Sequence, residues 1–154
     1  ANENDGISFW NGAVGVAVGN TCERNQYGAG LAASGKGTSV TFTNNIAREN
    51  GEAGIDLAGG ARGVIEGNTV ERNEFGGLAA SGDGTNAAFR TNTARENRFM
   101  GIWFTSGAGG MARGNTCENH GRAGIVVGSR CSPSLGNNVL RGNGNRNEVL
   151  YRDI

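Results

Sequence analysis

A chain of 154 residues has the length of one ordinary domain, and its 29 glycines, single proline and 6% aromatic residues exclude a helical bundle and a collagen-like repeat. Fourteen basic residues balance fourteen acidic ones, which argues against nucleic acid as the main partner. No apolar run approaches the roughly 18 residues of a membrane span, so no membrane partner is expected.

From residue 6 onward, a glycine followed by isoleucine or leucine recurs along the chain. The six copies lie 24, 24, 23, 24 and 23 residues apart, at Gly6, Gly30, Gly54, Gly77, Gly101 and Gly124. A second motif, first seen as Gly19-Asn20-Thr21-Cys22-Glu23-Arg24-Asn25, recurs with the same period. Repeats of this length are typical of solenoids, in which each unit buries its apolar face against its neighbours.

Within each unit, apolar residues occupy alternate positions, which indicates strands rather than helices. Two inward columns follow the glycines: Ile7, Leu31, Ile55, Leu78, Ile102 and Ile125, then Phe9, Ala33, Leu57, Ala80, Phe104 and Val127. Two more flank the asparagine motif: Ala17, Phe42, Ile65, Phe89, Ala112 and Leu135, then Cys22, Ala47, Val70, Ala94, Cys117 and Leu140. We therefore predict an all-β fold, a parallel β-helix of about six coils of 23–24 residues with three short strands per coil. At about 4.8 Å per coil, the rod is roughly 30 Å long.

The asparagines and charges of the second motif fit the same register. Asparagine amides stacked in register can hydrogen-bond from coil to coil, so we interpret these asparagines as architecture rather than catalysis. The charges that follow alternate in sign from coil to coil: Glu23, Arg48, Glu71, Arg95, Glu118 and Arg141. Such alternation favours one stacking register and argues against an ion-binding stripe.

Two further features concern single residues. Residues 30–38 match residues 77–85, which indicates duplication of a two-coil unit. The match aligns Lys36 with Asp83 and so argues against a fixed role for Lys36. Cys22, Cys117 and Cys131 are odd in number and lack metal-ligand spacing, so we expect apolar fillers and neither a disulfide framework nor a zinc site.

The pattern Gly-Asn-Thr, three residues, Asn, four or five residues, Gly-Ile resembles the right-handed parallel β-helix repeat family. The resemblance extends over residues 4–143. The family includes pectate lyases, polygalacturonases, alginate C5-epimerases, phage tailspikes and NosD-like periplasmic proteins, and the related carbohydrate-binding and sugar-hydrolase repeats look the same at this level. The resemblance implies a right-handed coil, in keeping with the general handedness of parallel crossovers, and an extracellular or periplasmic location. The shared motifs form the coil and specify no single activity.

Few residues are candidates for catalysis. Acid–base cleavage of a glycosidic bond needs two carboxylates about 5–9.5 Å apart, whereas the four aspartates are scattered along the chain. Only Asp56 occupies an outward strand position beside an inward column, which makes it the one catalytic candidate. No acidic cluster supports a calcium-dependent lyase, so we expect no metal and no cofactor. The single histidine, His120, is expected to be a surface turn residue rather than a general base.

The outward face of the strand after each Gly-Ile motif is the most distinctive surface. Its two columns are Ser8, Ala32, Asp56, Ala79, Trp103 and Val126, and Trp10, Ser34, Ala58, Ser81, Thr105 and Gly128. An exposed tryptophan among small residues suits stacking against a sugar ring. The predicted substrate-binding residues are Trp10, Asp56 and Trp103, bordered by Tyr27, Phe75 and Phe99. The alternative is that the tryptophans pack against another chain or against cap segments outside this sequence.

We expect one domain over residues 1–154, with coils over 1–143 and a polar C-terminal cap over 144–154. The chain starts in mid-repeat, which indicates a piece of a longer protein or a first coil that self-associates end to end. The leading functional hypothesis is a non-catalytic, carbohydrate-associated module that presents the Gly-Ile strand face to an extended polysaccharide. The alternatives are a compact polysaccharide lyase, epimerase or hydrolase around Asp56, and a purely structural self-assembling scaffold.

Overall fold

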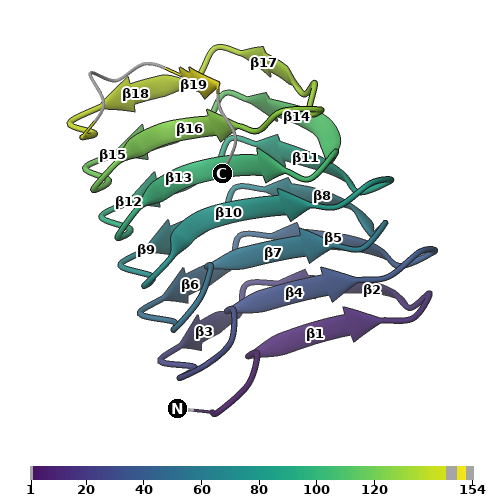
Figure 1. Cartoon of the computed structure of the whole chain (residues 1–154). Helices are drawn as coiled ribbons and strands as arrows, with labels where there is room; N and C mark the ends of the chain where they lie inside the picture. Colours follow the sequence, from purple (N-terminus) through teal and green to yellow (C-terminus); the bar gives the residue numbers. More distant parts are fainter. Residues whose placement is uncertain (1, 145–148, 152–154) are drawn as a thin grey trace.

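The computed structural model describes residues 2–144 and 149–151, and every regular element within them is a β-strand. The chain winds through six coils, and each coil adds one strand to each of three parallel sheets (Figure 1). This arrangement confirms the predicted β-solenoid with three short strands per coil. Within the described residues, no helix is long and apolar enough to cross a membrane.

The three sheets are named here in chain order. Sheet A contains β1 (Ile7–Trp10), β4 (Leu31–Ser34), β7 (Ile55–Ala58), β10 (Gly76–Ser81), β13 (Met100–Thr105), β16 (Ala123–Val127) and β19 (Val149–Tyr151). Sheet B contains β2 (Val14–Val18), β5 (Ser39–Thr43), β8 (Arg62–Glu66), β11 (Asn86–Arg90), β14 (Gly109–Arg113) and β17 (Ser134–Gly136). Sheet C contains β3 (Thr21–Glu23), β6 (Ile46–Arg48), β9 (Thr69–Glu71), β12 (Thr93–Arg95), β15 (Thr116–Glu118) and β18 (Val139–Arg141).

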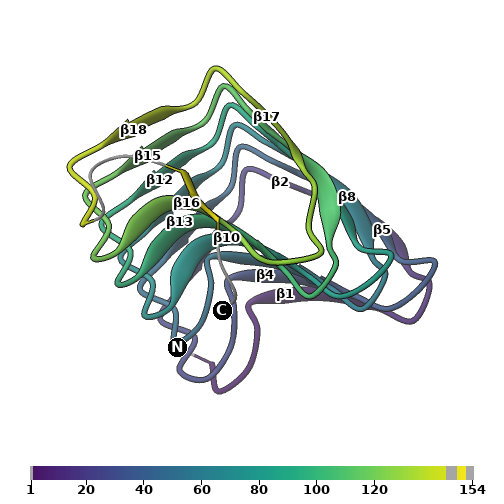
Figure 2. The same ribbon diagram turned by 45° about the horizontal axis from the view of Figure 1, so that its top comes forward.

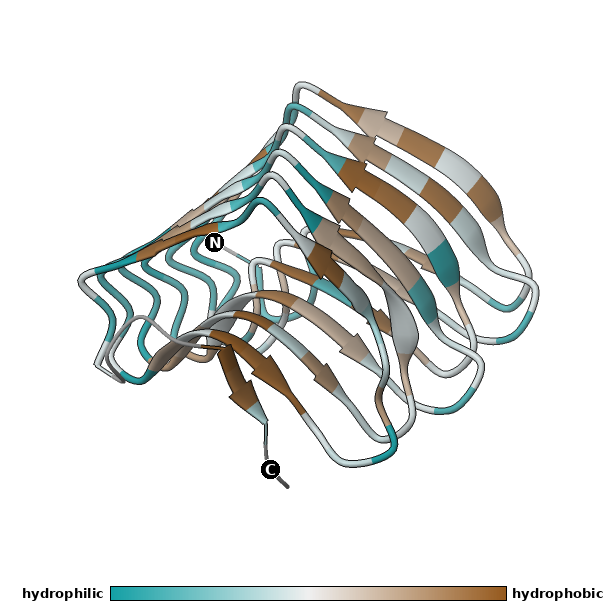
Figure 3. Cartoon of the chain, turned by 90° about the horizontal axis from the view of Figure 1, so that it is seen from above, coloured by the Kyte–Doolittle hydropathy of each residue, from teal (hydrophilic) through white to brown (hydrophobic). Residues whose placement is uncertain are grey.

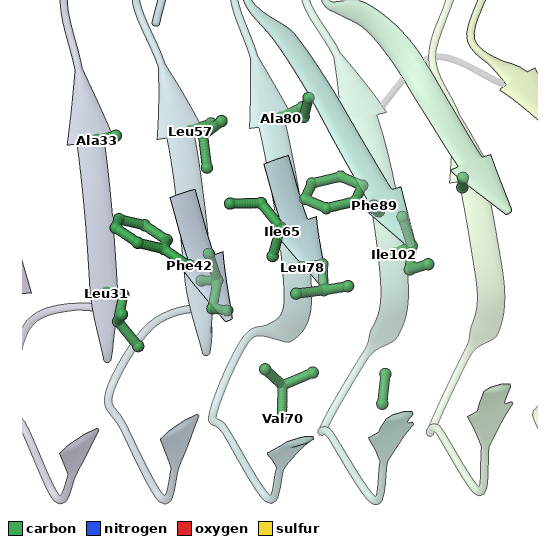
Figure 4. Close-up of a cluster of buried hydrophobic side chains, with 14 of the residues drawn as sticks. Leu31, Ala33, Phe42, Leu57, Ile65, Val70, Leu78, Ala80, Phe89 and Ile102 are labelled. Atoms are coloured by element: carbon green, nitrogen blue, oxygen red, sulfur yellow. The ribbon is translucent and has the colours of Figure 1, made fainter. Parts of the chain in front are cut away.

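The main hydrophobic core lies inside the coil, between the three sheets. The four predicted inward columns face it, and Phe42, Ile65 and Ile102 are fully buried (Figure 4). Seen from above, hydrophobic residues concentrate on the strands, whereas the corners are hydrophilic or rich in glycine (Figure 3). Large and small residues face one another in this core. For example, the Phe9 ring occupies the space that a Cβ on Gly15 would need. A small residue thus stands where a large one occupies the narrow interior.

The repeated glycine lies just before or within each sheet A strand, in close contact with the next coil. A Cβ on Gly54 would stand 2.9 Å from both Val70 Cβ and Asn73 Nδ2. Real Cβ atoms do not approach so closely, so any other residue here would push the coils apart. The sequence repeat is thus a steric requirement of stacking.

Asparagine side chains form two ladders along the axis, as predicted. Their members are Asn20, Asn45, Asn68, Asn92, Asn115 and Asn138 in the first ladder, and Asn25, Asn50, Asn73, Asn97 and Asn143 in the second. Asn45 is typical: its Nδ2 donates to Asn68 Oδ1 (3.0 Å) and to the Ala17 carbonyl (2.9 Å). Buried amides thus meet their hydrogen-bonding needs from the coils on either side.

His120 occupies the remaining position of the second ladder, so the prediction of a surface turn residue is wrong. Its side chain is only 2% exposed, and Nδ1 accepts a hydrogen bond from the Asn97 backbone amide (3.2 Å). Its own amide donates to Asn143 Oδ1 (3.0 Å). The histidine therefore accepts as an asparagine would, although an imidazole is larger than an amide.

The alternating charges on sheet C form the expected pairs. Arg48 lies 2.6 Å from Glu23, Arg95 lies 2.5 Å from Glu71, and the pair in the last two coils, Arg141 and Glu118, is 2.6 Å apart. These outer pairs join coils two by two, in phase with the sequence duplication. Glu71 is buried, whereas the other two pairs are solvent-accessible and contribute little stability, about 0–1 kcal/mol each. A shift of one coil would bring like charges together.

The C-terminal segment departs from the predicted cap in one respect. Residues 149–151 form β19, which pairs in parallel with β16 and adds a seventh strand to sheet A. The other residues of the predicted cap, apart from Gly144, lie outside the described residues.

Candidate functional site

The first outward column of sheet A is mostly buried. Parallel pairing brings Ser8, Ala32, Asp56, Ala79, Trp103 and Val126 into line, as the sequence predicts. However, Trp103 is only 7% exposed, and Ala79 and Val126 are 1% exposed. The prediction that Trp103 is an exposed sugar-stacking ring is therefore wrong.

Aromatic residues of the corners between sheets C and A cover Trp103. The Phe75 ring lies 5.1 Å from the Trp103 ring and 5.7 Å from the Phe99 ring. Gly76 allows the indole to lie against the backbone, because a Cβ there would collide with the ring. Trp103, Met100 and other buried residues form a second hydrophobic cluster outside the coil, and Phe99 packs against it. Figure 2 shows these corners stacked as a row of loops beside the sheet A strands.

The second outward column of sheet A stays accessible, and we call its first five residues the Trp10 column. Its members lie in register on consecutive strands: Trp10, Ser34, Ala58, Ser81 and Thr105. Trp10 is 59% exposed, and the residues beyond it are small or carry hydroxyl groups. The two tryptophans thus have different roles, since Trp103 packs and Trp10 faces outward.

The turns that follow the Trp10 column alternate between three and four residues. Residues 35–38 and 82–85 form four-residue turns, and residues 59–61 between them form a three-residue turn. Each four-residue turn grips the turn before it, since Thr38 Oγ1 accepts from the Gly12 amide (3.0 Å) and Thr85 Oγ1 from the Gly60 amide (2.9 Å). Each duplicated two-coil unit therefore contains one three-residue turn and one four-residue turn that are hydrogen-bonded to each other.

A hollow lies above the short turn in the third coil, and we call it the glycine hollow. It has a volume of about 640 Å³ and is lined by Gly59 and Gly60 together with Lys36, Arg62, Asp83 and other residues. Lys36 and Asp83, which the duplication aligns, lie on neighbouring four-residue turns on either side. Sequence reasoning missed this hollow, although the missing residue in the Gly59-Gly60 turn is a signal that could have indicated it.

Asp56 lies half-buried between Ala32 and Ala79 on sheet A. Burial, together with the nearby charges of Glu52 and Asp5, raises the pKa of Asp56 to about 6. The Asp5 carboxylate is itself held in place by the Ala29 amide (2.9 Å). Asp56 can therefore exchange a proton near neutral pH, which is the property required of a general acid or base.

Two other reactive side chains are locked in the core. Burial lowers the pKa of His120 to about 4, and burial raises the pKa of the Cys117 thiol to about 12. Cys22 and Cys131 are also free thiols. In the described part of the chain, no three His, Cys, Asp or Glu side chains are arranged to hold a metal ion.

Comparison with known proteins agrees with this architecture. The family defined as the right-handed β-helix region matches residues 1–94, more than half of the 154-residue chain. The chain therefore belongs to the right-handed β-helix family, and its solenoid is right-handed. Searches of curated proteins and of solved structures found no match. The family defines a fold rather than a reaction, so function has to be argued from the surface.

Proposed function

We propose that this β-helix is a non-catalytic module that binds an extended polysaccharide along the Trp10 column. One observation supports the proposal above all. Trp10 is 59% exposed at one end of a straight column of small and hydroxyl-bearing side chains. An indole can stack on the apolar face of a sugar ring, and the hydroxyl groups beyond it can bond to sugar hydroxyls.

The direction of the column suits a polymer better than a single sugar. Its five residues lie on five consecutive strands of one sheet. At about 4.8 Å between strands, the column extends about 19 Å along the axis of the rod. Strand pairing holds these positions in a fixed spacing, so little ordering is needed when a ligand binds.

The test is a binding titration with neutral and acidic polysaccharides, comparing the native chain with Trp10→Ala. Loss of ring stacking is expected to weaken binding about tenfold, equal to about 1.4 kcal/mol. Tyr27→Ala is the matched control. The sequence pattern placed Tyr27 beside the predicted site, but Tyr27, which is also exposed (70%), lies in the corner before β4, at the opposite end of the sheet A strands from the Trp10 column. Equal losses in both variants, or no binding by the native chain, would refute the proposal.

A second candidate function is enzymatic, and the pKa of Asp56 favours it. A carboxyl that titrates near pH 6 could act as an acid or base in polysaccharide cleavage or elimination. The same titration mixtures can be followed for new reducing ends and for the ultraviolet absorbance of unsaturated sugars, with and without calcium. Products that vanish in Asp56→Asn would replace the binding proposal with the enzymatic one.

A further inference from the structure

We propose that the glycine hollow receives an anionic group of the bound polysaccharide, either a carboxylate or a sulfate ester. The inference rests on the proposed function, because the hollow borders the Trp10 column. Ser34, Ala58 and Ser81 directly precede the three turns that form it. A chain lying along the column would therefore pass beside the hollow near the middle of the column.

The cations of the hollow are available, unlike most others on the surface. Among the described residues, neither Lys36 nor Arg62 forms an ion pair, and both are exposed. By contrast, the arginines at the outward charge positions of sheet C each pair with a glutamate. Two unpaired cations lining one cavity attract an anion, and a guanidinium can hold two oxygens of a carboxylate or sulfate at once.

The short turn leaves space in the hollow, because its residues carry no side chains beyond Cβ. Gly59 and Gly60 both adopt positive φ (59° and 90°), a conformation that other residues rarely adopt. Their amides are already engaged, since Gly59 N donates to the Ser81 carbonyl (3.2 Å) and Gly60 N to Thr85 Oγ1 (2.9 Å). These two amides are therefore not available to an anion, and the charged donors that line the hollow are the side chains of Lys36 and Arg62.

Asp83 on the opposite side makes the hollow asymmetric. Its carboxylate lies 3.6 Å from Arg130 Nη1, so it is partly neutralised from outside the hollow. A carboxylate accepts hydrogen bonds from hydroxyl groups and repels a second anion. A ligand with an anionic group beside hydroxyl groups fits this distribution, which describes an acidic sugar. The volume of about 640 Å³ is within the usual range of ligand sites, about 300–1,000 Å³.

The experiment measures affinity for three polymers: a polyuronate with carboxylates only, a sulfated neutral glycan, and the same glycan without sulfate. We expect the native chain to bind at least one anionic polymer about tenfold more tightly than the neutral one at low salt. The double variant Lys36→Gln/Arg62→Gln is expected to remove this preference and to leave affinity for the neutral polymer within about twofold. The two anionic arms decide between carboxylate and sulfate.

The double variant Arg90→Gln/Arg113→Gln is the matched control, because it removes the same charge from exposed positions of sheet B outside the hollow. Equal loss in the two double variants would overturn the inference and indicate attraction by overall charge. Binding that depends on Trp10 but does not distinguish the polymers would overturn the inference and leave the proposed function standing. No binding of any polymer would overturn both. Circular dichroism of each variant checks that it folds.

Discussion

At the residue scale, each corner asparagine joins its coil to the next through one side-chain amide. Asn73 shows the pattern, with Nδ2 donating to Asn97 Oδ1 (3.0 Å) and to the Ala47 carbonyl (3.1 Å). His120 takes this position in the fifth coil, and its buried Nε2 makes no hydrogen bond of good geometry among the described residues, although the Ala94 carbonyl lies near enough to interact with the ring. A buried donor without a partner costs about 1–3 kcal/mol. The ladder therefore has one weak position.

We predict that His120→Asn stabilises the protein by about 1–2 kcal/mol at pH 7, because an amide can complete the ladder. The gain grows on acidification. Burial holds the pKa of His120 at about 4 in the folded state, below its ordinary 6.5, so the unfolded chain binds the additional proton between these values. The native chain should lose about 2 kcal/mol relative to the variant between pH 7 and pH 5.

Urea unfolding of both proteins at pH 7, 6 and 5 measures this difference. The raised pKa of Asp56 acts in the opposite direction, since its folded carboxyl keeps a proton up to about pH 6 and loses that contribution as the pH rises. This effect is common to both proteins and cancels in the comparison. A difference that shrinks at low pH would contradict the assignment of His120 to the ladder.

At the element scale, the corners between sheets B and C depend on one left-handed residue each. The residues at this position have φ between 50° and 67°: Gly19, Asn44, Gly67, Thr91, Gly114 and Asn137. Glycine and asparagine tolerate this conformation, whereas a β-branched side chain does so poorly. Thr91 at φ 50° is therefore the strained member of the set.

We predict that Thr91→Asn stabilises the protein by about 0.5–1 kcal/mol, because it relieves this strain without loss of packing. Thr91 is exposed, and the hydrogen bond that its backbone amide donates to the Arg113 carbonyl (3.1 Å) would remain. The control is Thr93→Asn, which makes the same change inside the neighbouring strand β12, where asparagine is unfavourable. Denaturant midpoints should move in opposite directions, and a shared direction would show that strain at residue 91 is not the cause.

At the scale of the whole molecule, the described strands at the ends of the sheets can pair further. Strands β1, β2 and β3 each lie at the end of their sheet, and Val14, Val16 and Val18 on β2 are 58–81% exposed. Because β19 occupies the place beside β16 at the other end of sheet A, a second copy would meet this edge with its own β1, β2 and β3. We propose that the chain associates with itself end to end through this edge.

We expect sedimentation velocity to show species that grow with protein concentration. Val16→Lys places a charge on the edge strand and should leave a monomer. The matched control is Val64→Lys, because Val64 lies in the same outward column but on the inner strand β8. A native chain that stays monomeric at all concentrations, or equal effects of the two substitutions, would refute end-to-end association.

How much of the site could be predicted from sequence differs from residue to residue. The strand register placed Trp10 and Trp103 correctly on the outward face, but register carries no information about what lies over that face. Phe75 and Phe99 bury Trp103 because their corners fold back over sheet A. The prediction that His120 lies at the surface could have been avoided from the sequence. His120 follows Asn97 by 23 residues, which is one repeat, so it falls on the next position of the buried ladder.

By itself, the sequence determined the coil, its three strands, the inward columns and the alternation of charge. It could do so because these features repeat with the coil, and each repeat constrains the next through steric fit and hydrogen bonding. Tertiary structure alone decided which outward residues meet solvent, since that depends on how far each corner projects. The exposed ring of Trp10 and the hollow over Gly59 and Gly60 both arise where the length of a turn, rather than the repeat, controls access.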